Sequence, residues 1–98
     1  MQHNAADSDR IKKLKFRAWR RGFREADLIL GPFADQYLST LSDADVDAFE
    51  VLMDQPDQDL YAWIIEREPT PARFETAVMQ QIRDFRFGAR DSRSDIGG

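Results

Sequence analysis

The 98-residue sequence has no cysteine and a single histidine, His3. Without cysteine the chain cannot form a disulfide, use a thiol nucleophile or bind a metal through thiolates. One histidine in a polar segment also excludes a zinc site built from several histidines and a Ser-His-Asp triad. Ser39 and Thr40 have no base near them in the sequence, so neither is a candidate nucleophile. We therefore do not expect an enzyme, a catalytic residue or a metal site.

Long apolar runs are also missing. No segment approaches the roughly 20 apolar residues that span a bilayer, and the first ten residues lack the apolar core of a signal peptide. We therefore expect a cytoplasmic protein without membrane insertion. The length fits one domain, and 42% hydrophobic residues can form a small core but no large cavity. We predict a flexible N-terminal tail over 1–8, a helical domain over 9–90 and a flexible C-terminal tail over 91–98.

Charge is present in both signs but is unevenly distributed. The total is −4. Residues 1–24 hold eight Lys or Arg and two acids, whereas residues 25–68 hold one Arg and twelve acids. The sign changes between Arg24 and Glu25. A basic first segment followed by an acidic middle is therefore the feature that a structure has to explain.

Apolar residues recur at i, i+3 and i+4 through most of the chain, which predicts helices, and strict alternation does not persist. Gly22 fits the left-handed position that closes a helix. Ser42 fits a helix N-cap, and Thr70 followed by Pro71 fits another. The fold predicted is all-α, a small five-helix bundle with short connections. Its helices begin at Asp9 or Arg10, at Arg24 or Glu25, at Ser42, at Asp57 and at Thr70, and the first two end near Arg20 and Leu38.

Two further patterns receive structural interpretations. Proline at position 32 interrupts the second helix, but the apolar stripe continues in phase, so we expect a kink rather than a break. The series Asp43, Asp45, Asp47 resembles the start of a calcium loop, but Ala48 replaces the required glycine. These acids are better explained by their favourable position near a helix N-terminus.

A basic helix, a glycine turn and a second helix could form a helix-turn-helix. In that motif the second helix enters the DNA groove. Here the second helix carries Glu25, Asp27 and Asp35, which a phosphate surface would repel. A nucleic-acid-binding regulator, or an antitoxin-like interaction protein, therefore remains only the alternative function.

The turn itself is the strongest candidate site. Alternating charges surround one glycine, at which another backbone can approach closely. A capped helix end with Arg–carboxylate pairing across the turn would explain the same residues. Alternating signs favour a specific protein surface over a generic polyanion as the partner. The candidate partner-binding residues are Arg21, Gly22, Phe23, Arg24, Glu25 and Asp27.

Residues 21–25, Arg-Gly-Phe-Arg-Glu, match the R-G-x-x-E motif of the FAD assembly factors of the SdhE family. The segment 56–64 resembles the D-x-D-L-x-x-W segment of the same family. The resemblance covers roughly residues 10–87. It implies a five-helix bundle that acts as a chaperone, with Arg21, Gly22 and Glu25 at the centre of its interface and Arg24 and Asp27 beside them.

The resemblance also implies a function. Members bind the flavoprotein subunit of succinate dehydrogenase, and in some bacteria that of fumarate reductase, and promote the covalent attachment of FAD. The implied protein binds no cofactor tightly itself and acts on the FAD of its partner. We expect a monomer. An exposed Phe23 could support a weak homodimer.

Overall fold

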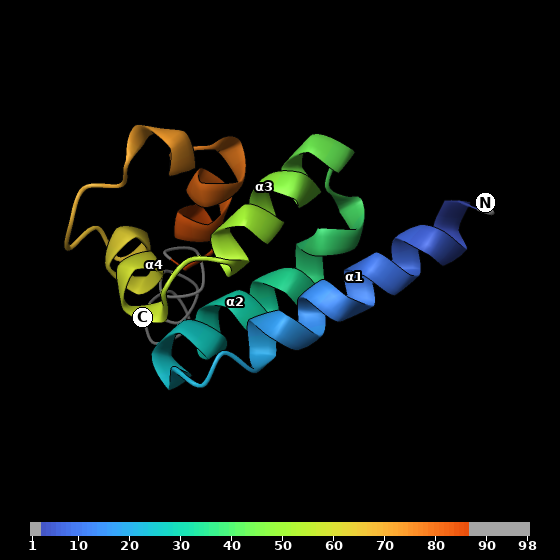
Figure 1. Ribbon diagram of the computed structural model, residues 1–98, viewed down its shortest axis with the longest axis horizontal. Helices are drawn as coiled ribbons and strands as arrows, with labels where there is room; N and C mark the ends of the chain where they lie inside the picture. The colour runs from blue at the N-terminus through green and yellow to red at the C-terminus, as the bar shows by residue number, and fades with distance from the viewer. Residues whose placement is uncertain (1–2, 87–98) are drawn as a thin grey trace, which may run out of the picture.

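The computed structural model describes the backbone of residues 3–86 and the side chains of residues 9–86. This part of the chain contains helices and no strand, which confirms the all-α prediction (Figure 1). It comprises five α-helices and two short 3-10 turns. They are α1 (His3–Trp19), α2 (Arg24–Tyr37), η1 (Leu38–Thr40), α3 (Asp43–Met53), α4 (Asp57–Ile64), η2 (Ala72–Phe74) and an α-helix over residues 77–86.

Helix α1 begins earlier than predicted. It starts at His3 instead of Asp9 or Arg10, so residues 3–8, which were assigned to a tail, are helical. No proline or glycine between His3 and Arg10 stops the helix from extending backward. The C-terminal segment 91–98, also predicted to be a tail, lies outside the described residues.

Helices α1 and α2 form an antiparallel pair, side by side in Figure 1. They approach closely at Gly31, where an added Cβ would lie within 3 Å of three ring atoms of Trp19. The indole Nε1 donates to Asp35 Oδ2 at 3.0 Å, which fixes the ring across α2. Helix α2 continues through Pro32 without a break, as predicted, and the kink stays a prediction. Proline removes the bond to the carbonyl of Leu28, but Leu28 lies on the exposed side, where water can replace that bond.

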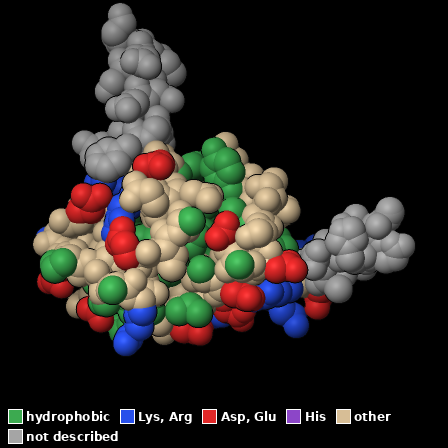
Figure 2. All heavy atoms as spheres, turned by 90° about the horizontal axis from the view of Figure 1, so that it is seen from above, with side chains coloured by type: hydrophobic (Ala, Val, Ile, Leu, Met, Phe, Trp, Pro, Cys, Tyr) green, Lys and Arg blue, Asp and Glu red, His purple; other side chains and the backbone are tan. Residues whose placement is uncertain are grey.

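Helix α3 begins as predicted, because the Ser42 hydroxyl accepts a hydrogen bond from the Asp45 amide at 3.2 Å. It lies alongside α1 and runs in the same direction. Arg10 donates to Asp47 and Glu50, both at 2.7 Å, and Arg17 donates to Asp54 at 2.7 Å. The ion pairs thus join the basic helix to the acidic one. The face of the molecule seen in Figure 2 carries acidic side chains more widely than basic ones.

The start of the last helix differs from the prediction. Thr70 and Pro71 precede the turn η2, and the α-helix starts only at residue 77. Its cap is Thr76, whose Oγ1 accepts a hydrogen bond from the Met79 amide at 3.3 Å. The pairing of Thr with Pro favoured the wrong cap, because the hydroxyl of Thr70 is used elsewhere, by Arg83.

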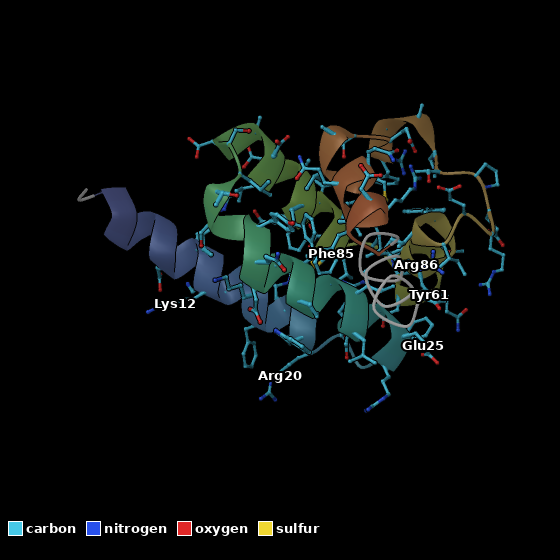
Figure 3. The ribbon with its side chains drawn as sticks, turned by 180° about the vertical axis from the view of Figure 1, so that it is seen from behind. Lys12, Arg20, Glu25, Tyr61, Phe85 and Arg86 are labelled. Carbon is cyan, nitrogen blue, oxygen red and sulfur yellow. The ribbon has the colours of Figure 1, made fainter. Side chains whose placement is uncertain are left out.

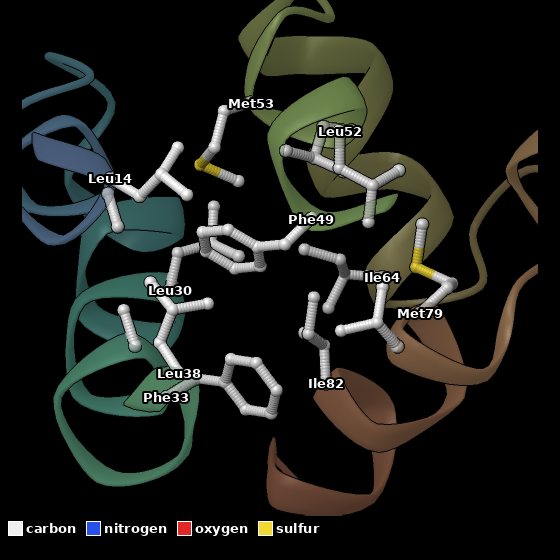
Figure 4. Packing of buried hydrophobic residues seen from close by; sticks show 14 of the residues in the cluster. Leu14, Leu30, Phe33, Leu38, Phe49, Leu52, Met53, Ile64, Met79 and Ile82 are labelled. Carbon is white, nitrogen blue, oxygen red and sulfur yellow. The ribbon is translucent and has the colours of Figure 1, made fainter. Parts of the chain in front are cut away.

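The core lies where all five helices meet. Phe49 is fully buried and lies among the labelled aliphatic side chains in Figure 4. It stacks against Phe33, with ring centroids 6.0 Å apart. Trp63 stacks on Phe74 at 5.0 Å, which fastens η2 to α4. Phe16, in contrast, is 60% exposed. Among the helices of the described part, none combines the length and apolar composition needed to cross a membrane.

Arg83, which was not among the predicted site residues, is buried as a whole residue, with 6% of its surface exposed. Its guanidinium donates to Glu75 at 2.8 and 3.1 Å and to Thr70 Oγ1 at 2.6 Å. Its Nε donates to the carbonyl of Trp63 at 3.3 Å. Arg83 therefore ties the connection between α4 and the last helix to the end of α4.

Replacing Arg83 by Met should lower the free energy of unfolding by about 2–3 kcal/mol, because several charge-assisted hydrogen bonds are lost together. Urea unfolding followed by circular dichroism measures this. Arg67→Met is the matched control, since Arg67 is exposed, and it should stay within about 0.5 kcal/mol of wild type. Equal midpoints for the two variants would show that the Arg83 contacts do not stabilise the fold.

The same contacts predict a pH dependence. The guanidinium of Arg83 lowers the pKa of the Glu75 carboxyl below its ordinary value of 4.5. The stability that this pairing gives is therefore present above the unfolded pKa and is lost as pH falls through the lower, folded one. Urea midpoints measured from pH 7 down to about pH 3 should fall less steeply in Glu75→Gln than in wild type. Parallel curves would contradict the assignment.

Candidate partner-docking site

The turn between α1 and α2 is built around Gly22. Its φ angle is +87°, a backbone conformation that favours glycine, as predicted. No neighbouring atom lies within 4 Å of the place where a Cβ would stand. A side chain at this position would therefore be strained by its own backbone but would meet open space. The glycine leaves the backbone of the turn open to another molecule.

Arg21 points away from that open side and into the protein. Its side chain is 7% exposed. Nη1 donates to the carbonyl of Met53 at 2.8 Å, and Nη2 donates to the carbonyl of Gln55 at 2.5 Å. These carbonyls lie at the C-terminal end of α3, where the helix leaves its last acceptors unpaired and a cation is favourable.

Arg21 also reaches α4. Its Nε lies 2.6 Å from Asp57 Oδ1, an ion-pair distance. The N–H does not point at that oxygen, so Nε has no hydrogen-bond partner and the attraction is electrostatic. One guanidinium thus connects the turn, the end of α3 and the first residue of α4.

Two other predicted site residues also face inward. Asp27 Oδ1 accepts a hydrogen bond from the Arg21 backbone amide at 3.1 Å, so it holds the turn in shape. Phe23 is half-buried, with its ring 5.1 Å from that of Tyr61 on α4. This contact leaves less exposed apolar surface for the predicted weak homodimer, and the oligomeric state stays a prediction.

The remaining three predicted residues, Gly22, Arg24 and Glu25, are exposed. Figure 3 shows Glu25 and Tyr61 at the same end of the molecule. The carboxylate of Glu25 makes no ion pair with any residue that the structure describes. The six residues therefore form one cluster, in which three hold the turn and three are available for contact.

A shallow groove of about 610 Å³ lies beside the turn. One wall is the segment 22–25, and the other is the segment 56–59 at the start of α4. The second wall was not among the predicted site residues, although the D-x-D-L-x-x-W segment signalled it. Within the described part, Asp59 is exposed and unpaired, so each wall carries a free carboxylate. The lining residues are Gly22, Phe23, Arg24, Glu25, Pro56, Asp57, Gln58 and Asp59.

The calcium-like series has another use. The three residues are part of helix α3 and do not form a loop. Asp43 and Asp45 lie in its first turn, and Asp47 pairs with Arg10. Over residues 9–86, no group of three or more His, Cys, Asp or Glu side chains could hold a metal ion. The groove offers an open backbone at Gly22 and exposed charged side chains at Arg24, Glu25 and Asp59.

Comparison with known proteins finds relatives of one kind. FAD assembly factor SdhE of Haemophilus ducreyi is 34% identical over 64 residues, which are 65% of this chain and 78% of that protein. Succinate dehydrogenase assembly factor 2, mitochondrial, of Mycosarcoma maydis is 41% identical over 69 residues, which are 70% of this chain and 29% of that protein. The protein of that name from Meyerozyma guilliermondii is 32% identical over 97 residues, which cover 82% of this chain and 72% of that protein.

The coverage is uneven. The chain spans between 29% and 51% of the relatives from Mycosarcoma maydis, Dictyostelium discoideum and Danio rerio. No solved structure gives a significant match. A family model described as flavinator of succinate dehydrogenase matches residues 12–86, which include both walls of the groove. This chain belongs to that family.

Proposed function

We propose that this protein is an assembly chaperone that binds the flavoprotein subunit of succinate dehydrogenase, or of fumarate reductase, and promotes covalent attachment of FAD to it. One observation carries the proposal. The segments 21–25 and 56–64, which carry the family resemblance, are far apart in the sequence, yet residues of both line one groove. A shared surface explains why a family would be recognised by both segments together.

The chaperone acts by binding and not by reacting. FAD has its own reactivity toward the histidine that the partner supplies, so a helper need only hold the flavoprotein in the competent geometry. A ligand that binds one conformer better than another increases the population of that conformer. The described residues offer no nucleophile–base pair, and no tightly bound cofactor is needed on this chain.

Within the groove, each residue has a separate part. Gly22 lets a partner backbone approach the turn, because nothing occupies the space above it. Glu25 can accept charge-assisted hydrogen bonds from the partner, and Arg24 can donate them. Arg21 acts indirectly, since its guanidinium is committed to α3 and α4.

The alternative helix-turn-helix function receives less support. The exposed acids Glu25 and Asp35 of α2 would face the phosphates, and Arg10 and Arg17 of α1 are already paired with acids. A regulator of this kind would bind DNA with a steep salt dependence, whereas the chaperone would co-purify with a flavoprotein.

Glu25→Ala should reduce covalent flavin on the partner subunit several-fold while the free energy of unfolding changes by less than about 1 kcal/mol, because the side chain is exposed and unpaired. The measurement is in-gel flavin fluorescence of the flavoprotein, made with the variant as the sole helper. Glu68→Ala, an exposed acid outside the groove, is the matched control. Wild-type flavin incorporation with Glu25→Ala would remove this residue from the site.

Arg21→Ala should also reduce flavin attachment, but by destabilising the fold instead of removing a direct contact with the partner. Losing contacts to two carbonyls and a carboxylate should cost about 3 kcal/mol of stability, and the groove should lose its shape. The urea midpoint of unfolding should decrease. The in-gel flavin fluorescence of the partner, measured at a temperature where the variant remains folded, should decrease as well. If flavin attachment is lost while unfolding is unchanged, Arg21 contacts the partner directly and the inward assignment is wrong.

A further inference from the structure

The side of α1 that faces away from the bundle carries an unusual combination of residues. Lys12 and Phe16 are four residues apart and share one side of α1, and Arg20, the residue after the helix, lies over the Phe16 ring. We call these three residues the α1 outer face. Figure 3 shows Lys12 and Arg20 projecting away from the other helices. Phe16, between them, is 60% exposed.

The charges of the α1 outer face are not neutralised within the part of the chain that the structure describes. Arg10 and Arg17, on the side toward α3, pair with acids at 2.7 Å. Lys12 and Arg20 form no ion pair with any residue between 9 and 86. The guanidinium of Arg20 lies instead 4.6 Å from the centre of the Phe16 ring, as a cation–π contact. An exposed aromatic ring between two unneutralised cations fits a partner surface that is both apolar and acidic.

This face is continuous with the docking groove. A hollow of about 300 Å³ is lined by Phe16, Arg20, Arg21 and Asp57, among others. Asp57 also lines the groove beside Gly22. A partner bound in the groove could therefore extend along a continuous surface to the α1 outer face.

We propose that an acidic segment of the flavoprotein subunit extends from the groove onto the α1 outer face, where it pairs with Lys12 and Arg20 and covers Phe16 with an apolar side chain. This proposal rests on the proposed function. The α1 outer face would then be a second contact with the partner. It is positive, whereas the groove walls carry the carboxylates of Glu25 and Asp59.

A protein suits this face better than a membrane or a nucleic acid. Recognition of an anionic membrane commonly uses a cluster of about four to eight cations. The α1 outer face has two, and the adjacent Lys13 is 3.7 Å from the carboxylate of Asp9. Asp35, which accepts from Trp19 Nε1 at 3.0 Å, lies on the neighbouring part of α2 and would be repelled by a polyanion. A folded partner can place its carboxylates opposite Lys12 and Arg20 and avoid Asp35.

The test measures association of the full chain with the purified flavoprotein subunit at about 50 mM and 300 mM salt. Lys12→Glu/Arg20→Glu should slow association at least tenfold at low salt, and the difference should shrink at high salt. Arg67→Glu/Arg73→Glu makes the same change in net charge at exposed positions outside both hollows, and should slow association less than threefold. Circular dichroism checks that each variant is folded.

Phe16→Ala should speed dissociation about tenfold at both salt concentrations, because apolar contact is not screened. Val51→Ala, at a 45%-exposed apolar position on α3, is its control and should leave dissociation unchanged.

The outcomes separate the two proposals. If wild type binds the flavoprotein and the α1 variants match their controls, the outer-face contact is wrong and the chaperone function stands. If wild type does not bind the flavoprotein, both proposals fall. If the α1 variants lose binding only to anionic vesicles or to a DNA duplex, this face serves a polyanion and the acidic-segment proposal is overturned.

Discussion

The buried guanidinium of Arg21 is the interaction on which the docking surface depends. It satisfies two carbonyls at the end of α3 and faces the carboxylate of Asp57 at 2.6 Å. Removing a charge from water is costly, and here two carbonyls and one carboxylate offset that cost, although Nε makes no hydrogen bond. Here the partners come from the two elements that must meet the turn. Holding the charge therefore also holds the two walls of the groove at a fixed separation.

The uneven charge distribution of the sequence has a structural cause. Basic α1 and acidic α3 run side by side, and their ion pairs follow in the same order along both helices. These pairs are 40% or more exposed, so each contributes at most about 1 kcal/mol and they set register more than stability. Beyond this series, Arg21 contacts Asp57 of α4 with its side chain only 7% exposed, so that contact is screened less by water. The sign change at residues 24 and 25 thus marks a packing arrangement as well as an exposed site.

Local rules predicted most of the fold, and long-range contacts explain the errors. Apolar spacing located the helices, and Ser42 and Gly22 were identified by properties of single residues. The last helix was misplaced because both Thr70 and Thr76 are residue types that can cap a helix, and the contact of Thr70 with the remote Arg83 is not visible in the sequence. The inward direction of Arg21 was equally hidden, since its acceptors are the backbone carbonyls of residues 53 and 55, which have no sequence signature. The motif could be located from the sequence, but its division into supporting and exposed residues could not.

That division affects how the surface would bind. Supporting contacts made by Arg21, Phe23 and Asp27 order the turn before any partner arrives, so less conformational entropy is lost on association. Within the described part of the chain, Glu25 and Asp59 form no ion pair, and the guanidinium of Arg21 is committed to the interior. The groove therefore stays negative, while the α1 outer face beyond Arg21 stays positive. Two adjoining patches of opposite sign can be matched by a partner in only one orientation, which gives specificity that neither patch would give alone.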